Sequence, residues 1–209
     1  MSWTLENYDR LAIALGEHIT LVGIALAISL ALAFPLGIWS ARRRAVYLVV
    51  MALTGMLYTV PALALFALLI PLMGLGTLPA ITALVLYSLL ILIRNIATGI
   101  RELPAELIEA ADGMGYGPWR RLWKIELPLA LPVIVAGVRI TTVTQISVAT
   151  VAAYISAGGL GDIIFQGITQ DFGEKIVAGA VATSLLAIVA DESLRRLELR
   201  LRAATSERL

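Results

Sequence analysis

Residues 19–39, ITLVGIALAISLALAFPLGIW, form an uncharged apolar stretch. Its length matches the roughly 20 residues that a helix needs to cross the hydrocarbon core of a bilayer. Further apolar stretches follow at about residues 46–70, 78–93, 129–153 and 176–190. Helices satisfy their backbone polar groups internally, and the short alternating segments of a membrane barrel are missing. The sequence therefore predicts an all-α polytopic membrane protein with about five transmembrane helices.

The composition supports this fold class. Of the 209 residues, 59% are hydrophobic and only 15% are charged, whereas soluble domains are about 45–50% apolar and about 25% charged. The net charge of +1 gives no indication of nucleic-acid binding. Because the chain has no cysteine, disulfides and cysteine-based metal sites are excluded, and we expect no metal site.

The basic residues predict how the chain is oriented. Lys and Arg gather in the loops that remain in the cytosol. With the N-terminus outside, the cytosolic side receives all but two of the loop and tail cations, and only Arg10 and Lys175 stay outside. We therefore expect an N-out, C-in topology. Residues 1–18 are expected to form an extracytoplasmic interfacial helix or a frayed lead-in, residues 19–202 a single membrane domain, and residues 203–209 a cytosolic tail.

The connection at residues 101–128 is much longer than a link between two spans requires. Pro104 suits a helix start, and the glycines at 113, 115 and 117 can end that helix. Pro118 can then open a second helix, which carries Trp119 and Trp123 on one face. Such a helix–elbow–helix unit either rests on its own bundle or docks a soluble partner. The residue pattern alone leaves these alternatives open.

One motif in this connection resembles a known family. The segment has Glu-Ala-Ala, a glycine four residues after it, and an Ile-x-Leu-Pro ending, at Glu109, Ala110, Ala111, Gly115, Ile125, Leu127 and Pro128. This pattern resembles the EAA loop of binding-protein-dependent ABC importer permeases. In that family the loop is a coupling helix that inserts into an ATPase subunit.

The resemblance implies a set of partners and a location. It implies an ABC ATPase dimer carrying ATP and Mg, a second permease subunit (identical or paralogous) and an extracytoplasmic substrate-binding protein. It also implies a multi-pass protein of a bacterial or archaeal cytoplasmic membrane. This chain itself would need no cofactor and would not be an enzyme. In agreement, it has no Walker phosphate loop and only one histidine, His18.

Three further segments resemble the subgroup that imports glycine betaine, carnitine and choline. They are residues 59–65 (TVPALAL), the pair Arg94-Asn95, and residues 157–162 (AGGLGD). Methionine-type permeases share the size and topology, so import of methionine or another small amine or amino acid is the alternative. A membrane scaffold or a secondary transporter is a third hypothesis.

Polar residues within the spans are candidates for the translocation path. Arg139 lies about ten residues into the fourth span, too deep to reach the headgroups easily, and Thr142 and Gln145 follow it. These side chains either line a pore or hydrogen-bond neighbouring helices. Arg94 lies near the cytosolic end of the third span, where it either snorkels or binds within the bundle.

A glycine-rich turn lies between the fourth and fifth spans. It contains Gly158, Gly159, Gly161 and Asp162. Three glycines in four residues permit close backbone packing or a re-entrant bend. The resemblance implies an outer gate region that meets the binding protein, and the alternative is an ordinary short turn.

Overall fold

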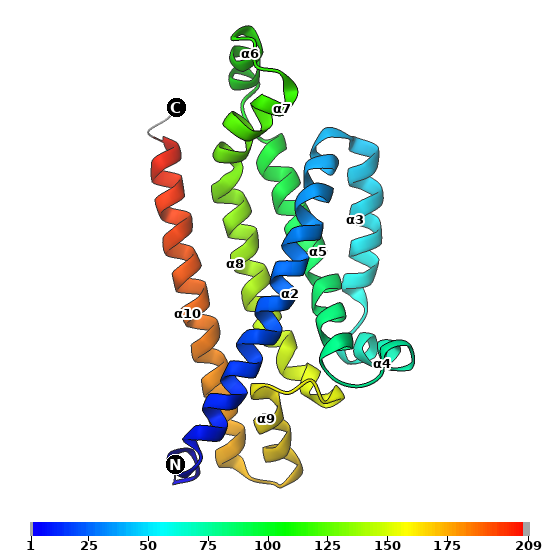
Figure 1. Ribbon diagram of the computed structural model, residues 1–209, viewed down its shortest axis with the longest axis vertical. Coiled ribbons are helices and arrows are strands. Elements are labelled where there is room, and N and C mark those ends of the chain that lie inside the picture. Colours follow the sequence, from blue (N-terminus) through cyan, green and yellow to red (C-terminus); the bar gives the residue numbers. More distant parts are fainter. Residues whose placement is uncertain (1, 207–209) are drawn as a thin grey trace.

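The computed structural model describes residues 2–206, and every regular element in that range is a helix. The long helices run side by side along the molecule (Figure 1). They are α2 (Tyr8–Arg42), α5 (Thr77–Arg101), α8 (Leu127–Ala152) and α10 (Gly173–Ser206). The shorter elements are α1 (Ser2–Glu6), α3 (Arg44–Thr59), α4 (Ala62–Met73), α6 (Ala105–Gly113), α7 (Pro118–Arg121), the π-helical turn η1 (Leu122–Glu126), the 3₁₀ turn η2 (Ala153–Ile155) and α9 (Leu160–Thr169).

The ends of the bundle differ. The N-terminal helix α1 and helix α9 lie at one end, whereas α6, α7 and the last turns of α10 lie toward the other (Figure 1). Helix α6, within the segment at 101–128, therefore projects past the ends of the long helices, at the same end of the molecule as the last turns of α10.

The spans confirm the predicted class, with one correction. Within the described residues, four helices are long and apolar enough to cross a membrane. The second predicted span, at 46–70, is not one straight helix, because α3 and α4 meet at an angle of 97°. Pro61 disfavours the helical conformation at the preceding residue, and Val60 is extended with ψ 127°. The hydroxyl of Tyr87 donates to the Val60 carbonyl, which satisfies that acceptor at the bend.

Helix α5 is the centre of the core. It packs against α2, α8, α3 and α4, and many of its residues are buried. Small residues allow this close contact, as is typical of membrane bundles. A Cβ added at Gly37 of α2 would lie 2.6 Å from Ile96, and one added at Gly137 of α8 would lie 2.5 Å from Asn95. Both neighbours therefore approach α5 at a glycine.

The terminal regions depart from the predicted boundaries. The segment expected to be interfacial is divided, since residues from Tyr8 onward belong to α2 and only Ser2–Glu6 forms a separate helix. The ring of Trp3 packs edge-on against Phe172 at a centroid distance of 6.5 Å. At the other end, residues 203–206 of the expected tail continue α10, while the final three residues lie outside the described part of the chain.

Candidate coupling elbow and transport pathway

Helix α6 projects from the bundle and ends in a tight turn. Gly115 has a φ of +78°, a conformation that favours glycine, and the N–H of Tyr116 donates to the Ala111 carbonyl across the turn. Ala111 is the only buried residue of α6. Glu109 and Ala110 are exposed. The first part of the motif is thus presented to the surroundings on a short, locally closed helix.

The second part of the motif anchors the segment from α6 to η1, which is called the elbow below. Pro118 occupies the start of α7, and the chain then continues through η1 into α8. Ile125 and Pro128 are half-buried, while Leu127 is buried in a core cluster that also contains Ile96 of α5. The motif residues therefore serve two purposes, with the Glu-Ala-Ala end exposed and the Ile-x-Leu-Pro end packed against the bundle.

A chain of ion pairs joins the elbow to α2. The carboxylate of Glu126 is 1% exposed and accepts from Arg42 Nη2 at 2.6 Å and from Arg121 Nε at 2.8 Å. Arg121 Nη1 also donates to Asp112 Oδ2 at 2.6 Å. Glu126 is not among the predicted site residues, because it occupies the free position of the Ile-x-Leu-Pro pattern. The sequence did offer one signal for this residue, since Glu126 is a single acidic residue that follows the basic residues of the second predicted helix.

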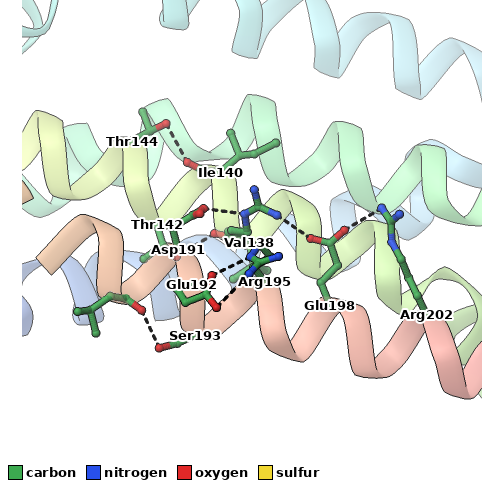
Figure 2. A network of polar contacts seen from close by, with 12 residues as sticks. Val138, Ile140, Thr142, Thr144, Asp191, Glu192, Ser193, Arg195, Glu198 and Arg202 are labelled. Atoms are coloured by element: carbon green, nitrogen blue, oxygen red, sulfur yellow. Dashed lines mark hydrogen bonds and ion pairs between the residues drawn. The ribbon is translucent and has the colours of Figure 1, made fainter. Parts of the chain in front are cut away.

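Arg139 pairs with α10. Its Nε donates to Asp191 Oδ1 at 2.6 Å and its Nη1 to Glu198 Oε2 at 3.1 Å. Figure 2 shows Asp191 and Glu198 on α10, with Arg202 on the far side of Glu198. Arg202 Nη2 lies 2.7 Å from Glu198 Oε1, so the second acid is held between two cations. This network occupies the seam between α8 and α10.

The other predicted pathway residues have partners of their own. Gln145 is buried, and its Nε2 donates to Ser88 of α5 at 2.7 Å and to Ser29 of α2 at 3.5 Å. Thr142 donates to the carbonyl of Val138 in its own helix. Arg94 is exposed on α5. These contacts make Gln145 a bridge between three helices, while the pathway role of the whole set stays a prediction.

The glycine-rich turn at residues 157–162, which is predicted to lie outside and is called the outer turn below, packs closely against α2 and α8. Gly158 and Gly159 have φ values of +80° and +83°, and the Gly159 N–H donates to Glu17 Oε2 at 2.9 Å. A Cβ added at Gly161 would lie 2.1 Å from the carbonyl oxygen of Thr150. Burial, followed by the charge of Glu17, raises the pKa of Asp162. The three glycines and Asp162 thus lie together where the turn meets α2 and α8, with Gly159 and Gly161 buried and Gly158 and Asp162 half-buried.

This helical bundle with an elbow beyond its spans is the architecture of a membrane transport subunit. The chain belongs to the family described as binding-protein-dependent transport system inner membrane component, whose profile matches residues 33–203. It is the permease component of an ABC importer and a multi-pass protein of the inner membrane. The predicted family resemblance is confirmed.

Several relatives match along nearly their whole length. The carnitine transport permease protein OpuCB of Listeria monocytogenes is 40% identical over 94% of this chain and 90% of its own. The choline transport system permease protein OpuBB of Bacillus subtilis is 42% identical over 92% and 89%. The osmoprotectant import permease protein OsmW of Salmonella typhimurium is 41% identical over 94% of both chains.

Solved structures share the fold. An inward-facing form of the MetNI methionine ABC transporter superposes with a TM-score of 0.84 at 22% identity, covering 91% of this chain and 95% of that one. An amino acid ABC transporter crystallised with histidines gives 0.75 at 17% identity, covering 95% and 97%. Within residues 2–206, no group of three or more His, Cys, Asp or Glu side chains could hold a metal ion.

Proposed function

We propose that this chain forms the membrane pathway of an importer for quaternary-ammonium osmoprotectants such as glycine betaine, carnitine and choline. The support is that relatives about 40% identical over nine tenths of the chain carry these solutes in their names. The methionine transporter is only 22% identical, and its likeness concerns the fold. Methionine or another small amine or amino acid is the alternative solute.

An ATPase dimer docks on α6 and hydrolyses ATP with Mg, while this chain contributes no catalytic group. The observation that carries this assignment is the exposed Glu109-Ala110 surface on a helix whose main packing partner is α7 and not a membrane span. A second permease subunit, identical or paralogous, completes the path. A substrate-binding protein delivers the solute at the end that carries α9, which is outside in the N-out orientation.

Uptake by the reconstituted complex tests the solute. Proteoliposomes that contain the permease, its ATPase and its binding protein are supplied with labelled glycine betaine, choline or methionine. We expect ATP-dependent uptake of at least one quaternary amine and none of methionine. Uptake of methionine alone would refute the osmoprotectant proposal, and uptake without ATP would favour a secondary transporter.

Charge reversal on α6 tests docking. Glu109→Lys places a cation on the exposed motif surface, and we expect loss of ATPase copurification. Glu6→Lys is the matched control, because Glu6 is also exposed but lies in α1 at the opposite end of the bundle. Equal ATPase recovery with both variants would contradict the docking assignment.

A further inference from the structure

The elbow joins α8 through an irregular turn. Residues Leu122–Glu126 form a π-helical turn, and the N–H of Leu127 donates to the Leu122 carbonyl across it. Such turns are rare and are often found at functional sites. Here the turn lies where the helix leaves the projecting elbow and enters the span, so a change in the direction of the elbow acts on α8 at this point.

Glu126 lies at the end of this turn and contacts two other elements. One carboxylate oxygen accepts from Arg42 in the last turn of α2, and the other accepts from Arg121 in α7. The Arg121 side chain is 14% exposed and that of Arg42 is 35% exposed, against 1% for Glu126. A buried carboxylate with both oxygens paired forms strong charge-assisted hydrogen bonds, and it is costly to leave unpaired.

This contact adds a second route from the elbow into the bundle. The direct route is the covalent one, from α7 through η1 into α8. Leu122 supports it with an apolar contact, since it is 2% exposed and belongs to a core cluster with Ala33 of α2. The Arg42–Glu126 pair is an ionic tie to the end of α2. Helix α2 packs extensively on the central helix α5, so a displacement of the end of α2 is transmitted to the core.

We propose that Glu126 is a positioning residue that locks the elbow to α2, so that α2 and α8 move together when the elbow is displaced. The proposal rests on the proposed function, in which a docked ATPase moves the elbow. Glu126 does not itself contact the ATPase in this scheme. It determines how much of the ATPase movement is converted into rearrangement of the helices.

The coupling of ATP hydrolysis to transport tests this role. Glu126→Gln keeps the shape of the side chain and removes the charge, and Arg42→Gln removes the same tie from the other side. We expect both variants to retain the ATPase on copurification. We also expect solute transported per ATP to fall at least about fivefold, a typical size for coupling between sites. The double variant should lose little more than Glu126→Gln alone, because Arg42→Gln removes a contact that Glu126→Gln already breaks.

Glu192→Gln is the matched control. Glu192 also accepts from two arginines, Arg195 and Arg196, but all three residues belong to α10 and are more exposed than Glu126. We expect its transport per ATP to equal that of the wild type. An unchanged ratio in Glu126→Gln would overturn the proposal, and so would loss of the ATPase from that variant, which would make Glu126 a docking residue. If the wild-type permease retains no ATPase, the proposed function itself fails, and this proposal with it.

A distance measurement tests the lock without relying on transport. The chain has no cysteine, so spin labels can be placed at Arg43→Cys beside α2 and at Gly117→Cys in the connection between α6 and α7. Arg43 is exposed, and a Cβ at Gly117 meets no atom within 4 Å. We expect a narrow distance distribution with the same mean in nucleotide-free and ATP-trapped complexes. Addition of Glu126→Gln should broaden it, and a distribution equally broad with and without Glu126 would overturn the proposal.

Discussion

The glycine-rich turns at the two ends of the molecule look alike in sequence but serve different purposes. At the elbow, a Cβ added at Gly113, Gly115 or Gly117 meets no atom within 4 Å. At the outer turn, a Cβ at Gly159 would lie 3.0 Å from His18, and one at Gly161 would overlap the Thr150 carbonyl. At the elbow, glycine is therefore required only for the backbone conformation of Gly115, whereas at the outer turn it permits both the backbone conformation and close contact.

This difference bears on how each end can work. The elbow has unoccupied space around its turn, which suits a surface that receives a partner. At the outer turn, Gly159 and Gly161 pack closely against α2 and α8, and the Gly159 N–H donates to Glu17 of α2. If this region is an outer gate, as the family resemblance implies, opening must move α9 together with its neighbours or break that hydrogen bond.

The largest expected effect comes from Gly161→Ala. The new methyl group would lie 2.1 Å from a backbone carbonyl oxygen of α8, which cannot rotate away as a side chain can. Overpacking of this kind typically costs about 1–3 kcal/mol and occasionally more. We expect the apparent Tm of the purified permease in detergent to fall sharply. An unchanged Tm would show that α9 can move away from α8, and the contrast between the two ends would be lost.

A smaller effect is expected for Gly115→Ala at the elbow. There is space for the methyl group, but φ is +78°, where an L residue is strained by roughly 1–2 kcal/mol. The strain is confined to a turn outside the spans. We therefore expect the Tm of the permease to change little and its affinity for the ATPase to fall, as measured by titration of the detergent-solubilised complex. A Tm decrease as large as that of Gly161→Ala would contradict the view that the turn after α6 lies outside the packed part of the molecule.

The sequence predicts the elbow better than the outer turn because its determinants are local. Pro104, the glycines and Pro118 fix helix ends within a few residues, and the motif identifies the exposed acid. The contact that makes Gly161 necessary comes from Thr150 in another helix, which no local pattern reports. For the same reason the role of Glu126 was missed, since its partner Arg42 is 84 residues away.

The structure of the spans, too, could be predicted only in part from the sequence. Apolar composition predicts that residues 46–70 are buried in membrane or protein, and Pro61 predicts a kink. Composition cannot distinguish a kink from the 97° bend that is observed. Arg139 was expected to face the bundle or a path because its depth excludes easy snorkelling. Its acidic partner Asp191 lies 52 residues further along, just beyond the last predicted apolar stretch at 176–190.

Protonation of Asp162 provides a test of the outer turn. Its pKa is raised by burial and by the charge of Glu17, so its ionised form destabilises the folded state above that pKa. Stability should therefore rise as the pH falls through the raised pKa toward the ordinary value of 3.8. We expect Asp162→Asn to raise the Tm near neutral pH and to flatten its dependence on pH between neutral and mildly acid conditions. If the Tm of the wild type and that of Asp162→Asn changed in parallel with pH, ionisation of Asp162 would be excluded as the cause of the pH dependence.

The smallest expected effect on stability is that of Gly113→Ala, the direct counterpart of Gly161→Ala. Gly113 is the last residue of α6, is exposed, and has open space where the methyl group would go. Alanine favours helix over glycine by up to about 1 kcal/mol, and less at a helix end. The Tm of the permease should thus stay level or rise slightly. Because the methyl group lies on the surface proposed to enter the ATPase, we expect a weaker complex despite the unchanged fold. A fall in Tm with undiminished ATPase binding would contradict this prediction. It would mean that Gly113 lies in a packed contact and that the ATPase docks on another surface.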